Sequence, residues 1–350
     1  MSDADTLDMP PTTDEARFLK LTVIAIRRET PDIKTFVFRP EGAMPDYDAG
    51  QSMTLRLTLD GERLFRTFSL ASAPGSDALA MTIKAHAEGR ATRWLHERLS
   101  VGDVIEGRRP RGRFTIAGRQ SESIALVSAG SGASPLMAMV RHLADTAPDI
   151  DIAWLHAARM PGDVLFPEEL AELQRRMPQL KIAMLVSQPS PGWFGFSGRL
   201  NRRLVSVAVP DFGRREVFCC GPAGFMEEAR LIHAAEGGTR AHFHIEHFGA
   251  VAPAAPAPIP DDAPATGFAI TMGEKRFLAR ADETLLEAAT RQTIVIPCGC
   301  ASGMCGTCRV SLVAGDVAMH HEGGISAEEE AQGFILACSS RPRSDVTIAL

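Results

Sequence analysis

Four cysteines near the C-terminus impose the strongest constraint on what this 350-residue chain can fold into. Cys300, Cys305 and Cys308 have the spacing C-x4-C-x2-C, and Cys338 follows about thirty residues later. This spacing is typical of plant-type [2Fe–2S] clusters, in which one tight loop supplies three thiolates. A zinc site or buried free thiols are the alternatives, but zinc modules usually pair two C-x2-C units. The four cysteines are therefore predicted ligands of a [2Fe–2S] cluster.

The residues around these cysteines fit a loop that wraps closely around a cluster. Gly303 and Gly306 allow the backbone to curl and to direct N–H groups at sulfur. Cys338 ends the apolar stretch 334–337, which we expect to be a buried segment that closes over the cluster. Cys298 lies two residues before the first ligand and is expected to be a bystander.

Length, charge and cysteine use exclude several classes of protein. The chain is long enough for two or three domains, and its net charge of −6 does not suggest a nucleic-acid binder. Residues 1–15 contain five acidic side chains and no Lys or Arg, unlike a signal peptide, and no apolar run approaches membrane-spanning length. Five of the seven cysteines lie in the C-terminal region, so no disulfide framework is indicated. We expect a cytoplasmic protein that does not bind membranes.

The pattern of apolar residues divides the chain into segments of different type. Residues 1–16 are expected to be disordered. Residues 17–117 contain short alternating strands, which predict an antiparallel β-barrel with one helix at 91–99. The strands are expected at 19–26, 34–38, 52–59 and 80–84.

From residue 118 the rhythm changes to strands that alternate with helices, which predicts an α/β domain with a parallel sheet over residues 118–248. Residues 249–266 are rich in Pro and Ala and are expected to form a semi-stiff linker. Residues 267–350 are expected to form an α+β module of the β-grasp type, with a hairpin at 268–278 and a helix that opens near Asp282.

Two motifs in the predicted barrel indicate a flavin site. The string Arg66-Thr67-Phe68-Ser69 can supply a cation for a phosphate, a flat side chain for the ring and a hydroxyl donor for a ring nitrogen. Such a string can also be ordinary strand surface. The segment Gly89-Arg-Ala-Thr92 places a small-residue turn at a helix start, where free N–H groups favour an anion such as a pyrophosphate.

Two motifs in the predicted α/β domain indicate a dinucleotide site. The segment 128–135 joins a strand to a helix, and its glycines allow a phosphate to approach the backbone closely. It is not the G-x-G-x-x-G fingerprint, so a purely structural turn is the alternative. Cys220-Gly221-Pro222 ends another strand at the carboxyl edge, where ligands bind in such sheets, although Cys220 could also be a small core residue.

The order of these motifs resembles the ferredoxin–NADP reductase superfamily fused to a C-terminal plant-type ferredoxin, over residues 18–350. The family's flavin motif Arg-x-Tyr/Phe-Ser matches Arg66, Phe68 and Ser69, and Thr92 replaces the usual serine of its phosphate turn. The nucleotide loop Gly-x-Gly-x-x-Pro matches residues 130–135. With these matches, cofactor contacts are expected from Arg66, Thr67, Phe68, Ser69, Ile83, Lys84, Gly89, Ala91, Thr92, Gly130, Ser131, Gly132, Ser134, Pro135, Cys220, Gly221, Pro222 and Met226.

The resemblance also implies catalytic roles. Members often carry a His-x-Glu-x-Phe string, which is matched here by residues 244–248. Phe248 would then lie against the flavin face that the nicotinamide must reach, with Glu246 in the polar wall near Cys220. Cys220 and Glu246 would steady the nicotinamide, and Ser69 would bond near the accepting nitrogen. A terminal strand with one core phenylalanine is the alternative for residues 244–248.

Resemblance further guides the choice of cofactors. Residues 110–115 look like the Pro-x-Gly-x-Phe-Thr of members that bind FAD, whereas FMN-binding phthalate-dioxygenase-reductase-like proteins tend to have Asn where Gly112 stands. FAD is therefore favoured over FMN. Arg159 could meet a 2′-phosphate, but Ser187-Gln188-Pro189 offers no cation, so NADH is favoured over NADPH.

The implied function is an NAD(P)H-dependent oxidoreductase that passes electrons through FAD and the cluster to a partner. The resemblance is to reductase components of Rieske-type oxygenases that act on quaternary amines such as glycine betaine, carnitine or stachydrine. Reductases of hybrid-cluster protein and of phenylacetyl-CoA epoxidation share the layout. A redox-sensing protein, whose cluster state controls partner binding, is the alternative outside enzymology.

Two further groups of residues have open interpretations. The arginine run at residues 108, 109, 111 and 113 could dock an acidic partner or the chain's own ferredoxin module, or it could be a solvated face. His320 and His321 are expected to be solvated loop residues rather than a metal pair, because adjacent side chains on a strand point to opposite faces.

Overall fold

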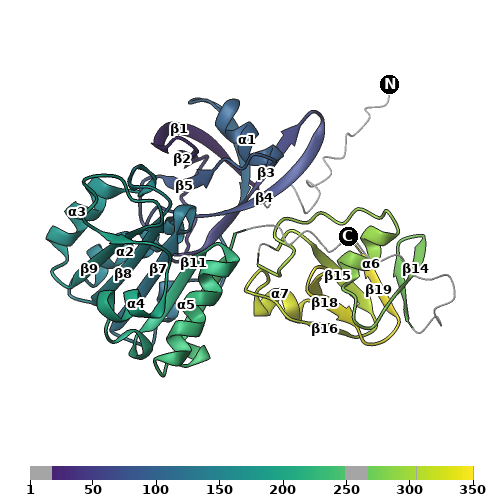
Figure 1. Ribbon diagram of the computed structural model, residues 1–350. Coiled ribbons are helices and arrows are strands. Elements are labelled where there is room, and N and C mark those ends of the chain that lie inside the picture. The colour runs from purple at the N-terminus through teal and green to yellow at the C-terminus, as the bar shows by residue number, and fades with distance from the viewer. Residues whose placement is uncertain (1–17, 249–266, 305, 350) are drawn as a thin grey trace.

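The computed structural model describes residues 18–248, 267–304 and 306–349 and arranges them in three regions, each with its own main sheet (Figure 1). We call residues 18–117 the N-terminal region, 118–248 the central region and 267–349 the C-terminal region. The predicted disordered segment 1–16 and the predicted linker 249–266 lie outside the described residues. None of the described helices is long and apolar enough to cross a membrane.

The N-terminal region is a six-stranded antiparallel sheet in the order β4-β3-β6-β1-β2-β5. Alternation along β2 places Phe36 and Phe38 in the core, whereas Arg39 faces out. The predicted strands are confirmed, and the predicted helix begins one residue earlier and ends at Glu97. The elements are β1 (Phe18–Thr30), β2 (Ile33–Pro40), β3 (Ser52–Leu59), β4 (Glu62–Ser69), β5 (Leu79–Lys84), α1 (Arg90–Glu97) and β6 (Val104–Arg108).

The predicted barrel closure is not confirmed. The edge strands β4 and β5 are joined by a single bridge between Leu70 and Met81 and not by a hydrogen-bonded ladder.

The central region is the predicted parallel sheet, in the order β10-β9-β8-β7-β11-β12. Because strand side chains alternate, Leu126 and Phe218 pack with α2 and α3 on one face, whereas Val127 and Cys219 pack with α4 and α5 on the other. The sequence did not predict β10 or α4. The elements are β7 (Ser123–Ala129), α2 (Ala133–Thr146), β8 (Asp151–Ala158), α3 (Pro167–Arg176), β9 (Leu180–Val186), β10 (Phe196–Ser197), α4 (Arg202–Ala208), β11 (Glu216–Gly221), α5 (Ala223–Ala235) and β12 (Phe243–His247).

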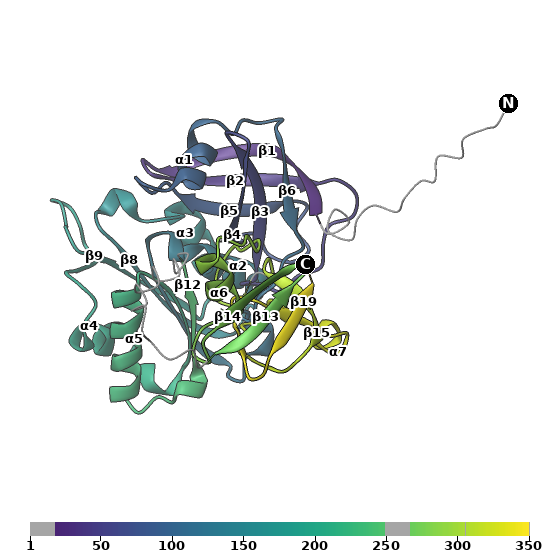
Figure 2. The ribbon, with the colours of Figure 1, turned by 90° about the vertical axis from the view of Figure 1, so that its right-hand side faces the viewer.

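The C-terminal region is a five-stranded mixed sheet in the order β14-β13-β19-β15-β17, with β13 parallel to β19 (Figure 2). The predicted hairpin is β13–β14. The predicted helix begins at Leu285, after a capping box between Thr284 and Glu287 that satisfies the free N–H groups of its first turn. The elements are β13 (Phe268–Met272), β14 (Lys275–Ala279), α6 (Leu285–Arg291), β15 (Arg309–Ala314), β16 (Val317–Met319), α7 (Ala327–Ala331), β17 (Phe334–Leu336), β18 (Ser340–Pro342) and β19 (Val346–Ala349).

Two open interpretations from the sequence are resolved by contacts of the C-terminal region. Arg108 Nη1 donates to Gly306 O at 2.9 Å, and Arg111 Nη1 donates to Glu329 Oε2 at 2.8 Å. The arginine run therefore docks the chain's own C-terminal region. The prediction of a solvated His321 is wrong, because its side chain is only 9% exposed and its Nε2 lies 3.0 Å from Glu330 Oε1.

Candidate active site

Two adjoining cavities lie where the N-terminal and central regions meet. The larger has a volume of about 1030 Å³ and the smaller about 450 Å³. Both are within the range of pockets that hold cofactors and small ligands. Lys84, His86, Ser131 and Phe248 line both cavities, so the two share a wall. Phe248 is 42% exposed and lies at this junction.

The smaller cavity brings together both predicted flavin motifs. It is lined by the end of β4 and by the turn before α1, with β5 between them, and these supply a cation, an aromatic ring and helix N–H groups. Thr92 Oγ1 donates to Gly89 O and accepts from His86 N, each at 3.2 Å, which holds the turn in place. The predicted residues in this wall are Arg66, Thr67, Phe68, Ser69, Ile83, Lys84, Gly89, Ala91, Thr92, Glu246 and Phe248.

Ser69 and Glu246 form the buried polar contact of this wall. Ser69 Oγ donates to Glu246 Oε2 at 2.7 Å, and both side chains are almost fully buried. Burial raises the pKa of Glu246 to about 8, although the hydrogen bond from Ser69 acts in the opposite direction. The carboxyl group is therefore mostly protonated at neutral pH, and it holds a proton beside the Ser69 hydroxyl.

The larger cavity brings together the two predicted nucleotide motifs. Gly130, Ser131 and Gly132 follow β7, and Gly221 and Pro222 end β11, so both segments lie at the carboxyl edge of the sheet. A Cβ atom on Gly132 would lie 2.2 Å from the carbonyl oxygen of Cys220, so only glycine permits this approach of the two loops.

Four of the expected contact residues line neither cavity. Cys220 is fully buried on the α2 side of β11, directly opposite Glu246 in the neighbouring strand, and burial raises its thiol pKa well above the usual value. Ser134 is buried in α2 and its Oγ donates to Ser69 O at 3.3 Å, so it supports the Ser69 backbone. Pro135 is buried in α2. Met226 is buried in α5, in the core on the other face of the sheet. These four residues lie behind the cavity walls because their places on β11, α2 and α5 direct the side chains to the core.

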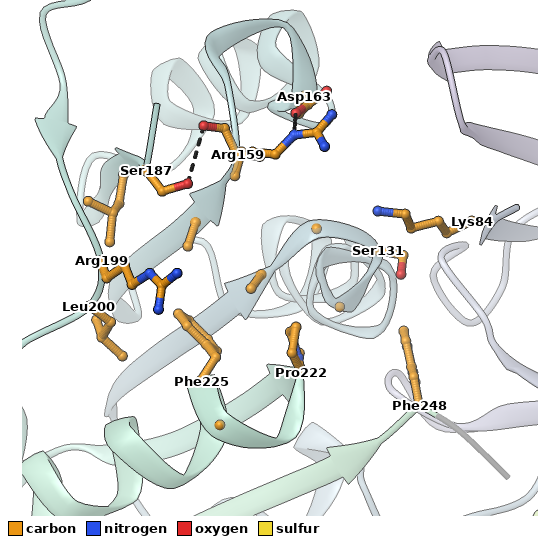
Figure 3. Close-up of a pocket in the computed structure, with 18 of the residues that line it drawn as sticks. Lys84, Ser131, Arg159, Asp163, Ser187, Arg199, Leu200, Pro222, Phe225 and Phe248 are labelled. Atoms are coloured by element: carbon orange, nitrogen blue, oxygen red, sulfur yellow. Dashed lines mark hydrogen bonds and ion pairs between the residues drawn. The ribbon is translucent and has the colours of Figure 1, made fainter. Parts of the chain in front are cut away.

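Arg199 lines the larger cavity and was missed by the sequence analysis. Figure 3 shows its guanidinium group beside Phe225 and directed into the cavity. It makes no ion pair with the residues that the structure describes, whereas Arg159 pairs with Asp163 at 3.7 Å. Arg199 left no signal in the sequence, because the segment that directly follows β9, Ser187-Gln188-Pro189, carries no cation. The short strand β10 adds a further carboxyl end, after which Arg199 follows.

The sulfur atoms of the described cluster ligands accept hydrogen bonds from backbone N–H groups. Ser302 N and Met304 N lie 3.4 and 3.3 Å from Cys300 Sγ, Gly303 N lies 3.2 Å from Cys338 Sγ, and Cys338 N lies 3.4 Å from Cys308 Sγ. Cys305 lies outside the described residues. Amide donors of this kind stabilise thiolates in iron–sulfur sites. The three described cysteines therefore fit the predicted cluster.

Two contacts of the cluster loop were not predicted. Cys298 is partly buried and packs against the core cluster that contains Cys308 and Cys338, and its assignment as a bystander stays a prediction. Cys300 and Met304 line the smaller cavity, which brings the cluster loop to the predicted flavin site.

Three protein-family models match consecutive stretches of the chain. Residues 20–116 match an oxidoreductase FAD-binding domain, residues 126–231 an oxidoreductase NAD-binding domain, and residues 270–343 a 2Fe-2S iron–sulfur cluster binding domain. Each match falls within one of the three regions, in the same order along the chain.

Full-length similarity is also found. The chain is 33% identical to the glycine betaine monooxygenase reductase subunit of Chromohalobacter salexigens, with 93% of each chain covered. It is 34% identical to the stachydrine N-demethylase reductase subunit of Rhizobium meliloti, with 91% of this chain and 93% of the other covered. The solved structure of phthalate dioxygenase reductase has the same fold, with a TM-score of 0.59, 24% identity and coverage of 96% and 99%.

Replacing Glu246 should change the pH dependence of stability. A carboxyl group whose pKa is raised on folding makes the folded state bind more protons, so it lowers stability as pH rises from about 4.5 to about 8. Glu246→Gln should remove this loss, which we expect to be roughly 3 kcal/mol between pH 5 and pH 8. Urea unfolding at both pH values measures it. Parallel losses of stability in the wild type and the variant would contradict the assignment.

Replacing Arg199 should weaken dinucleotide binding without slowing turnover. Arg199→Ala removes a cation from the larger cavity, and we expect KM for the reduced dinucleotide to rise about fivefold, or about 1 kcal/mol, with kcat unchanged. Arg203→Ala is the matched control, because Arg203 is exposed and lines neither cavity. A KM that is unchanged in Arg199→Ala would show that Arg199 does not contact the ligand.

Proposed function

Because the chain belongs to the ferredoxin–NADP reductase superfamily with a C-terminal [2Fe–2S] ferredoxin domain, we propose that it is the reductase component of an oxygenase system. It is an NAD(P)H oxidoreductase that uses FAD and a [2Fe–2S] centre. The observation that carries the proposal is the position of Cys300 and Met304 in the wall of the smaller cavity. Electrons that reach a flavin in that cavity have a short path to the cluster loop.

When bound, the cofactors would supply the electron chemistry: acceptance of two electrons and their single release at the flavin, and one-electron storage at the cluster. The residues supply position and charge. We propose that Arg66 and the turn at Gly89 bind the FAD phosphates, while Phe68 lies against the flavin ring. Ser69 and Glu246 form the polar end of the site, where Glu246 fixes the direction of the Ser69 hydroxyl.

Phe248 has a separate role in this proposal. It lies where the larger and smaller cavities meet, so it covers the place where a nicotinamide would reach the flavin ring. Gly132 and Pro222 shape the larger cavity for the dinucleotide. Cys220 supports Glu246 from the neighbouring strand.

We further propose a Rieske-type oxygenase of a quaternary amine as the acceptor and NADH as the electron donor. Two relatives that match over more than nine-tenths of the chain are reductase subunits of glycine betaine and stachydrine oxidation, and both substrates are quaternary amines. The donor assignment rests on the absence of a cation from Ser187-Gln188-Pro189. The presence of Arg199 in the same cavity makes a direct comparison of KM for NADH and NADPH the deciding measurement.

Loss of one cluster ligand tests the order of electron flow. Cys308→Ser should abolish the cluster spectrum and lower NADH–cytochrome c reduction by at least about tenfold, because the single-electron exit is removed. NADH–ferricyanide reduction, which requires only the flavin, should persist. Cys298→Ser is the matched control and should keep the cluster.

Unchanged cytochrome c reduction in Cys308→Ser would refute the relay. Flavin reduction by NADH without multiple turnovers, with every electron acceptor tried, would favour the redox-sensing alternative. A pull-down with the tagged protein that retains an oxygenase component would identify the acceptor.

A further inference from the structure

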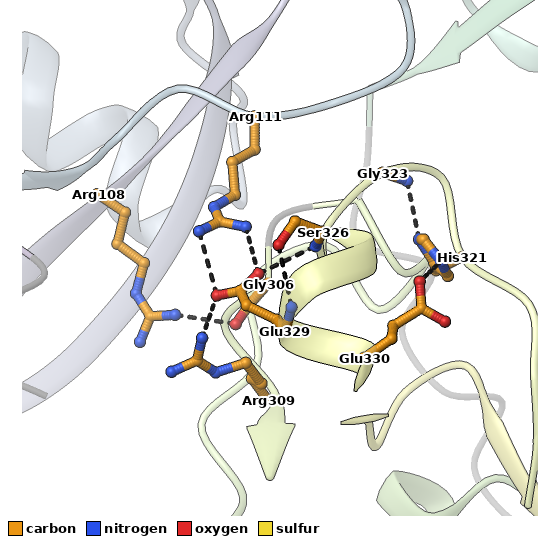
Figure 4. A network of polar contacts seen from close by, with 9 residues as sticks. All are labelled: Arg108, Arg111, Gly306, Arg309, His321, Gly323, Ser326, Glu329 and Glu330. Atoms are coloured by element: carbon orange, nitrogen blue, oxygen red, sulfur yellow. Dashed lines mark hydrogen bonds and ion pairs between the residues drawn. The ribbon is translucent and has the colours of Figure 1, made fainter. Parts of the chain in front are cut away.

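The N-terminal and C-terminal regions meet through a compact set of polar contacts around α7 and the cluster loop (Figure 4). Arg108 Nη1 donates to Gly306 O at 2.9 Å, and the backbone N–H of Arg113 donates to Glu322 O at 3.1 Å. Arg111 donates to both carboxylate oxygens of Glu329, at 2.8 and 3.3 Å. The Arg111–Glu329 contact is bidentate and ionic, so it is the strongest directional contact of this set.

Glu329 joins three separate features through one carboxylate. It completes the capping box of α7, in which Ser326 N donates to its Oε2 at 3.0 Å, and it pairs with Arg309 at the start of β15. Its side chain is only 16% exposed. Burial alone would raise the pKa of Glu329, but the hydrogen bond and charge of Arg111 hold it below its usual value, so the group is ionised at neutral pH.

The position of the Arg111–Glu329 ion pair matters because the cluster loop contacts the N-terminal region beside it. Ser52 Oγ lies 3.8 Å from Met304 Sδ, and a Cβ atom on Gly112 would lie 3.7 Å from Met304 Cγ. Ser52, Cys300 and Met304 all line the smaller cavity. The ion pair and the wall of the cavity are therefore parts of one interface.

We propose that Glu329 is a positioning residue for internal electron transfer: through Arg111 it holds the cluster loop against the flavin cavity. This inference rests on the proposed function and assigns roles to Arg111 and Glu329, two positions at which no motif of the family specifies a residue. Two of the neighbouring charges do not share the role. Glu330 pairs with His321 inside its own region, and Arg109 makes no hydrogen bond or ion pair with the residues that the structure describes.

The capping role of Glu329 has to be separated from its docking role. Glu329→Gln keeps an oxygen that can complete the capping box but removes the charge that Arg111 and Arg309 bind. Arg111→Met removes the same ion pair from the opposite side and leaves the C-terminal region unaltered. The matched controls are Arg109→Met and Glu328→Gln, which remove the same charges from the same segments.

The experiment measures docking and electron transfer separately in the holoprotein. Hydrogen–deuterium exchange of residues 108–113 reports on docking, because the Arg113 N–H crosses the interface. Anaerobic stopped-flow mixing with NADH reports flavin reduction and then cluster reduction. We expect Arg111→Met and Glu329→Gln to speed exchange and to slow cluster reduction roughly five- to tenfold, or about 1–1.4 kcal/mol, with flavin reduction unchanged. The double variant should be no slower than the single ones, because both remove one interaction.

Three results would overturn the inference: exchange and cluster reduction equal to the wild type in both variants, equal effects in the two controls, or additive losses in the double variant. Failure of the proposed function has a different signature. In that case the wild type itself would reduce its flavin without reducing its cluster, and the inference about docking would be decided by the exchange rates alone.

Discussion

A buried hydrogen bond of 2.7 Å joins Ser69 and Glu246, which are 177 residues apart in the chain and belong to two different sheets. It connects the end of β4 to β12, the last strand of the parallel sheet, in the wall of the smaller cavity. A protonated carboxyl group is the form that can be buried there with one hydroxyl partner, since an ionised one would lose too much hydration. Together with the bonds from Ser134 to Ser69 O and from Arg141 to Ala71 O, the contact holds the N-terminal and central regions together, and it keeps a titratable proton inside the site.

Close backbone approach is the second constraint on the site. Gly132 lies against the carbonyl of Cys220, and Gly323 lies against Arg113, where an added Cβ would meet side-chain and backbone atoms at 2.6–3.2 Å. The first glycine lets two loops of the nucleotide cavity converge, and the second lets the C-terminal region reach the arginine run. The nucleotide cavity and the docking of the C-terminal region thus each depend on a glycine, because any larger residue would prevent the backbone contact.

The strands, the parallel sheet and the cluster loop were predictable because each follows from local patterns. Alternation marked the strands around Phe36 and Phe38, and the change to buried strands before helices marked the central region. The flavin and nucleotide motifs also reached the cavities, since they end strands or begin helices. Cys220, Ser134, Pro135 and Met226 did not, because a motif identifies a segment but does not say which side of it faces the ligand.

By itself, the sequence determined the chemistry: cysteine spacing, glycine turns and the order of motifs depend on residues close together in the chain and define which groups can be bound. The tertiary structure decided what lies beside what. Arg199 lines the larger cavity just after the unpredicted strand β10, His321 contacts Glu330, and Arg111 meets Glu329 across 218 residues. These contacts form only when separate segments pack together in three dimensions, since charge, burial and close approach between segments leave no periodic pattern in the sequence.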